Sequence, residues 1–371
     1  MSIEPIKMPK WGLAMEEGKI VEWWAKEGDQ VKEGDDLVDI ETSKITNVCE
    51  AHQDGTLRKI VASLDETLPV GALIAVMAES DVSDDEIDAF IEDYQANFDP
   101  GEAAGDESGP EIRTVDVYGR TLRVGVMGED LPGTPIVLLH GFGGDLNNWM
   151  LVQPALAEER PVYAIELPGH GQSAKDVGDG KLGTIATGIV AAIDALGLGS
   201  FSLAGHSLGG AIAAEVAART GARVKGLGLV CPASMPGGSI NVDYLDAFVS
   251  ARRSKDLREP AKNLFADVSF VTRDMLEDLI KAKRLDGAQN ALTLIKDNLK
   301  GDDPAYAALG DRLNDIEAPI ILIASKTDQI VGAPDAAAFP AGTKDIWIED
   351  VGHMPHLEKS AEVANALKEL A

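Results

Sequence analysis

Three residues have the types and the order along the chain that nucleophilic catalysis needs: Ser207, Asp328 and His353. A serine hydroxyl is a weak nucleophile unless a base takes its proton and a third group orients that base. We therefore predict Ser207 as the nucleophile, His353 as the base and Asp328 as the acid that orients the base. Negative charge on a tetrahedral intermediate also needs backbone donors, and we expect these from the N–H groups of Leu208 and Phe142.

The sequence around Ser207 predicts a strand, a sharp turn and a helix. The apolar run 201–204 leads into Gly205-His206-Ser207-Leu208-Gly209, and the small residues of 211–219 predict a helix. Because both glycines lack side chains where the turn is crowded, Ser207 is expected at its apex, with an exposed hydroxyl and a strained backbone. Gly-x-Ser-x-Gly alone is weak evidence, since both residue types are common in turns.

The acid and the base each follow a predicted strand. Residues 320–324 form a buried-strand run that opens into the loop of Asp328, and residues 346–348 predict a short strand before the loop of His353. All three candidates are therefore expected just past the carboxyl ends of strands of one sheet. Their order, nucleophile, acid and base, is the one that a nucleophile-elbow fold requires.

Together these segments resemble the α/β-hydrolase superfamily from about residue 112 to the end. The resemblance rests on the motifs around Ser207, Asp328 and Gly352-His353, and on two further loops, His140-Gly141-Phe142-Gly143-Gly144 and Pro168-Gly169-His170-Gly171-Gln172-Ser173. It implies an α/β fold with a mostly parallel, doubly wound sheet. We rank His353 ahead of His356 as the base, because Gly-His after the last strand is that superfamily's pattern.

The remaining histidines of these motifs, His140, His170 and His206, are interpreted as structural. Residues 233–316 change to an amphipathic, charged and helical pattern, which predicts a helical lid over Ser207. Most of the large apolar lid residues are expected in the lid core and some along a substrate channel: Tyr244, Phe248, Leu264, Phe265, Leu276 and Leu279. No Lys/Arg cluster marks a phosphate site, and the weak candidates are scattered lid residues: Arg252, Arg253, Lys281 and Lys283.

The N-terminal segment contains an internal repeat. A shift of 37 residues places Gly18 on Gly55, and it also places Gly34 on Gly71. Each half has short apolar runs separated by glycine and acidic turn residues, which predicts a small all-β sandwich with pseudo-twofold symmetry. The chain must turn back between the two halves, so Lys44 is expected at the tip of a hairpin.

This segment, about residues 3–78, resembles the lipoyl domains of 2-oxo-acid dehydrogenase complexes. The resemblance is carried by Glu41-Thr42-Ser43-Lys44, by residues 9–18 and by residues 31–35. It implies covalent lipoate on Lys44. Biotin carriers share the fold but flank their lysine with methionines, whereas serine and isoleucine flank the lysine here. A lipoylated lysine is a long flexible arm that can visit several active sites.

Residues 79–111 carry thirteen acidic residues and no Lys or Arg. This composition predicts an acidic linker between a lipoyl domain of residues 1–78 and a catalytic domain of residues 112–371. Within the linker, residues 83–98 predict one helix with Ser83 as its N-cap. The apolar stripe of this helix would either dock a partner or pack on the lipoyl domain.

Charge and cysteine content limit the class of protein. The net charge is −29, which disfavours nucleic acid and anionic membranes as partners. The two cysteines, Cys49 and Cys231, fall in different predicted domains and lack metal-ligand spacing, so we predict no metal site. With no signal peptide or membrane span in the pattern, the protein is expected in the cytoplasm.

The two halves together resemble the dihydrolipoamide acetyltransferase components of acetoin dehydrogenase complexes. The resemblance implies that a thiamine-diphosphate-dependent acetoin-cleaving component acetylates the lipoamide on Lys44. It also implies that coenzyme A takes the acetyl group and that dihydrolipoamide dehydrogenase reoxidises the arm. Two alternatives stay open. The chain could be an esterase or thioesterase with an appended lipoyl domain, or a lipoyl carrier whose hydrolase-like domain is structural.

Overall fold

The computed structural model describes residues 3–9, 11, 15–42, 46–79, 81–98 and 109–370. The chain forms two compact units, Met1–Gly109 and Pro110–Ala371. Each unit contains its own buried apolar cluster. A chain of this length needs two such clusters, because a single hydrophobic core rarely grows this large.

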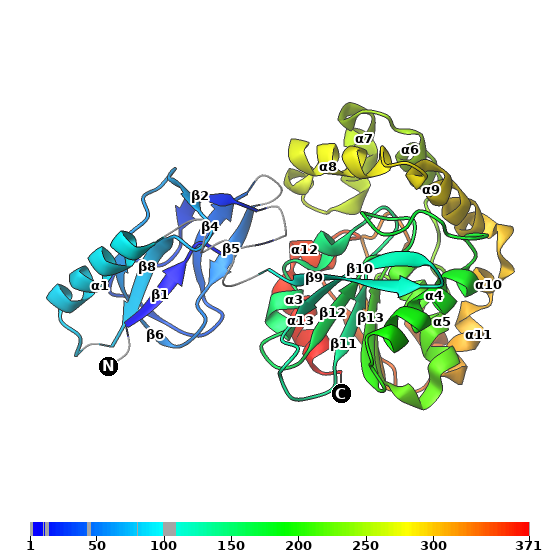
Figure 1. Cartoon of the computed structure of the whole chain (residues 1–371), viewed down its shortest axis with the longest axis horizontal. Coiled ribbons are helices and arrows are strands. Elements are labelled where there is room, and N and C mark those ends of the chain that lie inside the picture. Colours follow the sequence, from blue (N-terminus) through cyan, green and yellow to red (C-terminus); the bar gives the residue numbers. More distant parts are fainter. Residues whose placement is uncertain are drawn as a thin grey trace. The chain divides into compact units, whose positions relative to one another are not determined.

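The first unit is an all-β sandwich of two four-stranded antiparallel sheets (Figure 1). One sheet has the order β1-β8-β6-β3 and the other the order β5-β4-β2-β7. The strands are β1 (Ile3–Lys7), β2 (Glu17–Trp23), β3 (Gln30–Val31), β4 (Asp36–Glu41), β5 (Thr46–Glu50), β6 (Gly55–Ile60), β7 (Thr67–Pro69) and β8 (Leu73–Ala78). The predicted sandwich is confirmed.

The sequence repeat relates strands of opposite sheets. The shift of 37 residues that aligns the two halves of the repeat maps β2 onto β6, β3 onto β7 and β4 onto β8. A Cβ atom at Gly18 would lie 2.6 Å from Met8 Sδ, and one at Gly55 would lie 2.8 Å from Met77 Cε. In both halves a methionine of the core therefore packs directly on the glycine backbone, and a side chain at this place would have to displace it.

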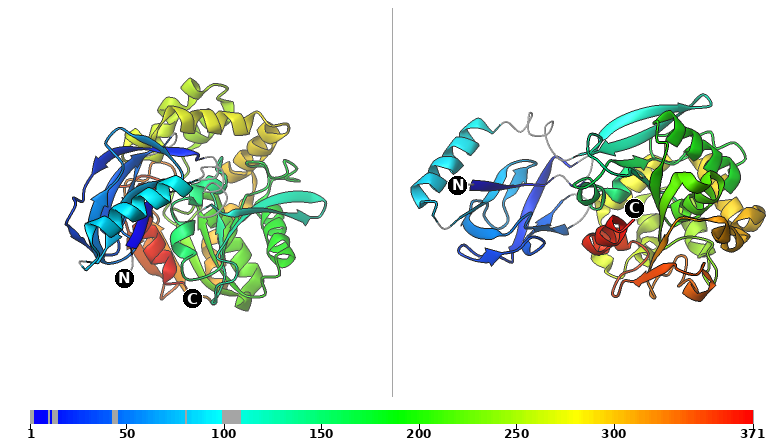
Figure 2. Two further views of the ribbon diagram at one scale, coloured as in Figure 1. Left: turned by 60° about the vertical axis from the view of Figure 1, so that its left-hand side comes forward. Right: turned by 90° about the horizontal axis from the view of Figure 1, so that it is seen from below.

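The helix predicted after the sandwich is present as α1 (Asp84–Asn97). The Ser83 side chain accepts a hydrogen bond from the Glu86 N–H, and the Glu86 carboxylate accepts one from the Ser83 N–H, which makes a capping box. Ile87 is buried against the sandwich, and the Tyr94 hydroxyl donates to the Gly71 carbonyl at 2.8 Å. The apolar stripe of α1 thus packs on the lipoyl-like unit to which the helix belongs. The helix runs along the outside of that unit (Figure 2).

Lys44, with Ser43 and Ile45, lies outside the described residues. The flanking strands are described: β4 and β5 form an antiparallel pair whose last paired residues are Glu41 and Thr46. Only residues 42–45 connect these two strands.

The second unit is built on an eight-stranded sheet of order β16-β15-β14-β13-β11-β12-β10-β9. The pairs of β9 and β10 and of β10 and β12 are antiparallel, and all the others are parallel. The strands are β9 (Glu111–Val117), β10 (Arg120–Met127), β11 (Ile136–Leu139), β12 (Val162–Ile165), β13 (Phe201–His206), β14 (Val224–Val230), β15 (Ile320–Ala324) and β16 (Lys344–Trp347). The predicted mostly parallel sheet is confirmed.

Helices cover both faces of this sheet (Figure 1). On one face α4 (Leu182–Ala195) packs against α5 (Leu208–Thr220), and on the other α3 (Gln153–Leu156) packs against α13 (Ser360–Lys368). The short helix α12 (Pro355–Glu358) precedes α13. Parallel strands in the middle of such a sheet are buried on both faces, which is why their sequences are continuous apolar runs.

The insertion between β14 and β15 is helical, as its pattern predicts, and its first helices gather at one end of the sheet (Figure 1). Its helices are α6 (Val242–Ser250), α7 (Ser254–Ala261), α8 (Arg273–Lys283), α9 (Ala288–Asp297), α10 (Pro304–Ala307) and α11 (Leu309–Arg312). The large apolar residues named from the sequence belong to the core, with Leu279 partly buried and the other five buried. We call this insertion the lid.

Among the described residues, none of the helices has both the length and the apolar character needed to cross a bilayer.

Replacing Ser83 by alanine should destabilise α1 by about 1 kcal/mol, because the Glu86 N–H loses its acceptor. Hydrogen exchange of the α1 amides measures this change. The matched control is Ser63→Ala in the same unit, where the structure gives the hydroxyl no role. If α1 amides exchange at the wild-type rate in Ser83→Ala, the capping box does not hold the helix.

Candidate active site

Ser207 stands in a strained turn between β13 and α5. Its backbone angles are φ 53° and ψ −118°, a region that non-glycine residues rarely adopt. A Cβ at Gly205 would lie 2.1 Å from the Gly209 carbonyl oxygen, and a Cβ at Gly209 would lie 2.3 Å from the Leu139 carbonyl oxygen. Only glycine fits at either position, so the predicted elbow follows from close approaches of the backbone.

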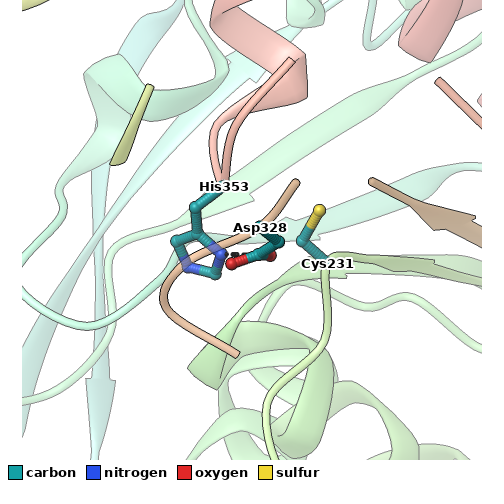
Figure 3. Close-up of side chains that lie close together, drawn as sticks. All are labelled: Cys231, Asp328 and His353. Atoms are coloured by element: carbon teal, nitrogen blue, oxygen red, sulfur yellow. Dashed lines mark hydrogen bonds and ion pairs between the residues drawn. The ribbon is translucent and has the colours of Figure 1, made fainter. Parts of the chain in front are cut away.

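Asp328 and His353 form a buried pair (Figure 3). His353 Nδ1 lies 2.8 Å from Asp328 Oδ2, and the two residues are 2% and 7% exposed. Asp328 Oδ1 accepts the backbone N–H groups of Ile330 at 2.8 Å and Val331 at 3.0 Å. The carboxylate is thus fixed on both oxygens, and it holds the imidazole with Nδ1 protonated and Nε2 free to accept a proton.

Burial by itself would raise the pKa of Asp328. The neighbouring His353, through its charge and its hydrogen bond, and the two backbone donors outweigh burial and keep the pKa below the usual value for aspartate. The group therefore remains a carboxylate at neutral pH and can stabilise an imidazolium on His353.

The backbone of His353 is bonded to two further elements. Its N–H donates to the Leu264 carbonyl of the lid at 2.7 Å, and its carbonyl accepts Nε2–H of His206 at 2.8 Å. His206 immediately precedes Ser207, so the elbow and the loop of the base are directly joined. Together with Asp328, these contacts tie His353 to the acid loop, the lid and the elbow.

Gly352 explains why a glycine precedes the candidate base. A Cβ at this position would lie 2.7 Å from the Leu264 carbonyl oxygen and 2.7 Å from Phe265 backbone atoms. The Gly352 N–H donates to Glu358 at 2.6 Å, and the same carboxylate accepts the N–H groups of Ala266 at 2.7 Å and Asp267 at 3.1 Å. Glu358, which the sequence did not indicate, therefore links the loop of the base to the lid.

Cys231, at the end of β14, also meets this pair (Figure 3). Its sulfur, an Asp328 carboxylate oxygen and a His353 ring nitrogen all lie within 4.8 Å of one another. Burial, and then the adjacent Asp328 carboxylate, raise the pKa of the Cys231 thiol well above its usual value. The 2.8 Å separation of Nδ1 and Oδ2 is that of a hydrogen bond, so we interpret this trio as a thiol packed on the acid.

The two predicted oxyanion donors flank the elbow. Leu208 begins α5, and the first N–H groups of a helix have no partner within the helix. Gly141 approaches Ser207 so closely that a Cβ there would lie 3.2 Å from Ser207 Cβ, which places Phe142 next to the elbow. The Phe142 ring packs edge-on against Phe248 of the lid, with ring centroids 5.6 Å apart.

The other histidines of this unit are buried and neutral. Burial lowers the pKa of His140 to about 4, and the pKa values of His170 and His356 to about 3. Neither ring nitrogen of His356 has a hydrogen-bond partner among the described residues, whereas His353 has the carboxylate. The geometry therefore favours His353 over His356 as the candidate base.

Comparisons with known proteins cover both units. Residues 136–366 match the alpha/beta hydrolase family, and residues 4–77 match the family described as biotin-requiring enzymes. A protein of Pseudomonas putida named dihydrolipoyllysine-residue acetyltransferase component of acetoin cleaving system is 41% identical over 97% of this chain and 96% of its own. A protein of the same name from Cupriavidus necator is 37% identical over 99% of this chain and 97% of its own.

A solved structure supports the fold of the second unit. The serine hydrolase from Cycloclasticus zankles superimposes with a TM-score of 0.63 at 19% identity, over 70% of this chain and 97% of that one. At this identity the likeness shows the fold alone.

A fluorophosphonate probe should label Ser207 in the wild-type protein, because an activated serine displaces fluoride from such probes. Ser207→Ala should not react, and Asp328→Asn should react about 10⁴-fold more slowly, because it stabilises the wrong tautomer of His353. Mass spectrometry of the labelled peptide measures the rate. His356→Phe is the control and should react at close to the wild-type rate; loss of labelling in that variant would make His356 the base.

Acid should destabilise the second unit. Buried neutral histidines have lower pKa values in the folded than in the unfolded state. Their contribution to the unfolding free energy is therefore complete above pH 6.5 and is lost as pH falls toward their folded-state pKa values. At roughly pH 5.5 each such histidine should cost about 1.4 kcal/mol of unfolding free energy. Native-state hydrogen exchange of β13 and β14, compared at roughly pH 7.5 and 5.5, measures the loss.

His356→Phe should lose less unfolding free energy on acidification than the wild type. His52 is exposed, and His52→Gln should lose as much as the wild type. An unfolding free energy that is the same at both pH values would mean that the buried histidines are not neutral in the folded protein.

Proposed function

The chain belongs to the family of dihydrolipoyllysine-residue acetyltransferase components of acetoin cleaving systems, with a second unit of the alpha/beta hydrolase family, and we propose that it passes an acetyl group from lipoamide on Lys44 to coenzyme A through Ser207. One observation carries the proposal: the same chain holds a strand hairpin that ends in the lysine motif and a buried histidine–carboxylate pair beside a nucleophile elbow. As a component of such a system, the chain acts together with other enzymes.

The attachment site is proposed from the hairpin. The pairing of β4 and β5 up to Glu41 and Thr46 supports this proposal, because Lys44 falls in the four-residue sequence 42–45 between the two strands. Glu41 and Thr46, the last paired residues of the hairpin, are themselves exposed. Lipoate bound there supplies a dithiol that carries the acetyl group as a thioester.

In the first half of the proposed reaction, Ser207 Oγ attacks the carbonyl carbon of the thioester. The hydroxyl proton passes to His353 Nε2, and Asp328 stabilises the imidazolium through Nδ1–H. The N–H groups of Leu208 and Phe142 hold the oxyanion. When the C–S bond breaks, the proton moves from His353 to the departing thiolate, and the acetyl group remains on Ser207 as an ester.

In the second half, the thiol of coenzyme A gives its proton to His353 and attacks the ester carbonyl. The C–O bond to Ser207 breaks, and the proton returns to Ser207 Oγ. A transferase must keep water from taking the place of the thiol. The lid contributes to this, because Leu264 is bonded to His353 and Phe248 covers the loop of Phe142.

The proposed partners follow from this reaction. A thiamine-diphosphate-dependent acetoin-cleaving component would supply the acetyl group, and dihydrolipoamide dehydrogenase would reoxidise the dithiol. We propose a cytoplasmic setting, where the two free buried cysteines, Cys49 and Cys231, stay reduced.

With acetylated dihydrolipoamide on Lys44, the wild-type protein should form acetyl-coenzyme A when coenzyme A is present. Ser207→Ala should lose this product by at least about 10³-fold. Acetyl-coenzyme A and free acetate are quantified together by chromatography. His356→Phe serves as the control for changes in the buried histidine cluster and should retain most of the activity.

Two results would contradict the proposal. Acetate formed at the same rate with and without coenzyme A would make the second unit a thioesterase. Full transfer by Ser207→Ala, together with its loss in Lys44→Arg, would make the chain a lipoyl carrier with direct transfer and no acyl-serine.

A further inference from the structure

One segment of the lid, residues 252–284, has a charge opposite to that of the chain as a whole. Residues 252–284 contain nine of the 33 Lys and Arg residues but only six of the 62 Asp and Glu residues. This segment is therefore net positive in a chain whose net charge is −29. A polyanionic substrate is repelled by such a protein as a whole, so it needs a local positive site.

Most cations of the lid are neutralised by a carboxylate beside them. The ion pairs include Arg253–Asp256, Lys262–Glu259, Arg273–Glu277, Lys281–Asp278, Lys296–Asp246 and Lys300–Asp246. These pairs lie along single helices or between neighbouring ones, and they leave little net charge for a ligand.

Three other cations gather where the end of α6, the start of α7 and the end of α8 meet. Arg284 Nη2 donates to the Arg252 carbonyl at 3.4 Å, and Lys283 Nζ donates to the Ala251 carbonyl at 2.8 Å. Among the described residues, none of these three side chains forms an ion pair with a carboxylate. Two of the four scattered candidates, Arg252 and Lys283, thus form a cluster with Arg284, which we call the lid cation cluster. The other two, Arg253 and Lys281, are ion-paired instead.

Lys283 is the unusual member of this cluster. It is only 7% exposed, and a buried ammonium group without a carboxylate partner is rare because desolvation opposes its charge. Burial, and then the positive charge of Arg252, lower the pKa of Lys283 to about 8, although Asp256 acts in the opposite direction. An anion bound at the cluster would relieve this repulsion.

The side chain of Arg252 is already held in place. Its Nη1 donates to Gln289 Oε1 at 2.5 Å, and Gln289 Nε2 donates to the Val249 carbonyl of α6 at 2.9 Å. A guanidinium fixed in this way loses little entropy when it binds a phosphate. The guanidinium can hold the phosphate through two N–H groups.

The cluster lies close to the candidate active site. Lys283 Nζ is 4.9 Å from the centroid of the Phe248 ring, and that ring is 5.6 Å from the ring of Phe142. Only the Phe248 ring therefore lies between Lys283 and Phe142, a predicted oxyanion residue. The pantetheine arm of coenzyme A is long enough to span this separation, with its thiol toward Ser207 and its phosphates at the lid.

We propose that Arg252 and Arg284, with Lys283 behind them, bind the phosphate groups of coenzyme A. This inference rests on the proposed function, because it takes coenzyme A as the acyl acceptor. It assigns the recognition of the acceptor to the lid and leaves the chemistry to the residues at the ends of the strands.

The test compares two double variants of the full-length, lipoylated protein. Arg252→Gln with Arg284→Gln removes two charges from the lid cation cluster, and Arg273→Gln with Lys300→Gln removes two ion-paired charges from the same lid. Both change the net charge equally. Calorimetry gives the Kd for coenzyme A, the transfer assay gives KM values for coenzyme A and for pantetheine, and the melting temperature checks that each variant folds.

The cluster variant should raise Kd and KM for coenzyme A at least tenfold and leave KM for pantetheine, which lacks the phosphates, within twofold. The control variant should keep all three values within twofold. Equal weakening in both variants, or wild-type binding of coenzyme A by the cluster variant, overturns the inference. If the cluster variant alone weakens coenzyme A binding but the wild type transfers no acetyl group, the inference stands and the proposed function fails.

Discussion

A buried imidazole–carboxylate pair is stable only if the polar groups around it are satisfied, and the second unit is organised around this constraint. Asp328 uses both carboxylate oxygens, one for His353 and one for two backbone N–H groups. The backbone of His353 is bonded to the lid on one side and to His206 on the other. The base is thereby held by three separate elements, all of which must be folded before it is in position.

The same contacts give the lid its place in the proposed reaction. Leu264 and Glu358 fix one segment of the lid to the loop of the base, and Phe248 packs on the loop of Phe142. A lid attached at both sides of the elbow can exclude water while its outer surface faces a second substrate. The net positive segment 252–284 of the lid, within a strongly acidic chain, fits a substrate that carries phosphates.

The sequence predicts the elements well and the long-range contacts poorly. Gly205, Gly209 and Gly352 mark the site because glycine is needed wherever the backbone approaches another chain segment closely, and such positions are visible as motifs. Glu358 bonds to Ala266 across 92 residues, and Lys283 donates to the end of α6 across 32. Neither contact has a local pattern, because it depends on how the lid folds back onto the sheet. The sequence indicates Arg252 and Lys283 only as scattered candidates for the same reason: Arg252 is 32 residues from Arg284, and the packing of α6, α7 and α8 brings them together.

The most direct test of the account is to trap the acyl-enzyme. The full-length protein, with acetylated dihydrolipoamide on Lys44 and no coenzyme A, is quenched in acid within one turnover, and its peptides are examined by mass spectrometry. An acyl-serine intermediate predicts an acetyl group on the peptide of Ser207 that disappears when coenzyme A is added before the quench, with acetyl-coenzyme A formed in equal amount. Transfer to coenzyme A at the full rate, with no acetyl group on Ser207 at any time, would contradict it.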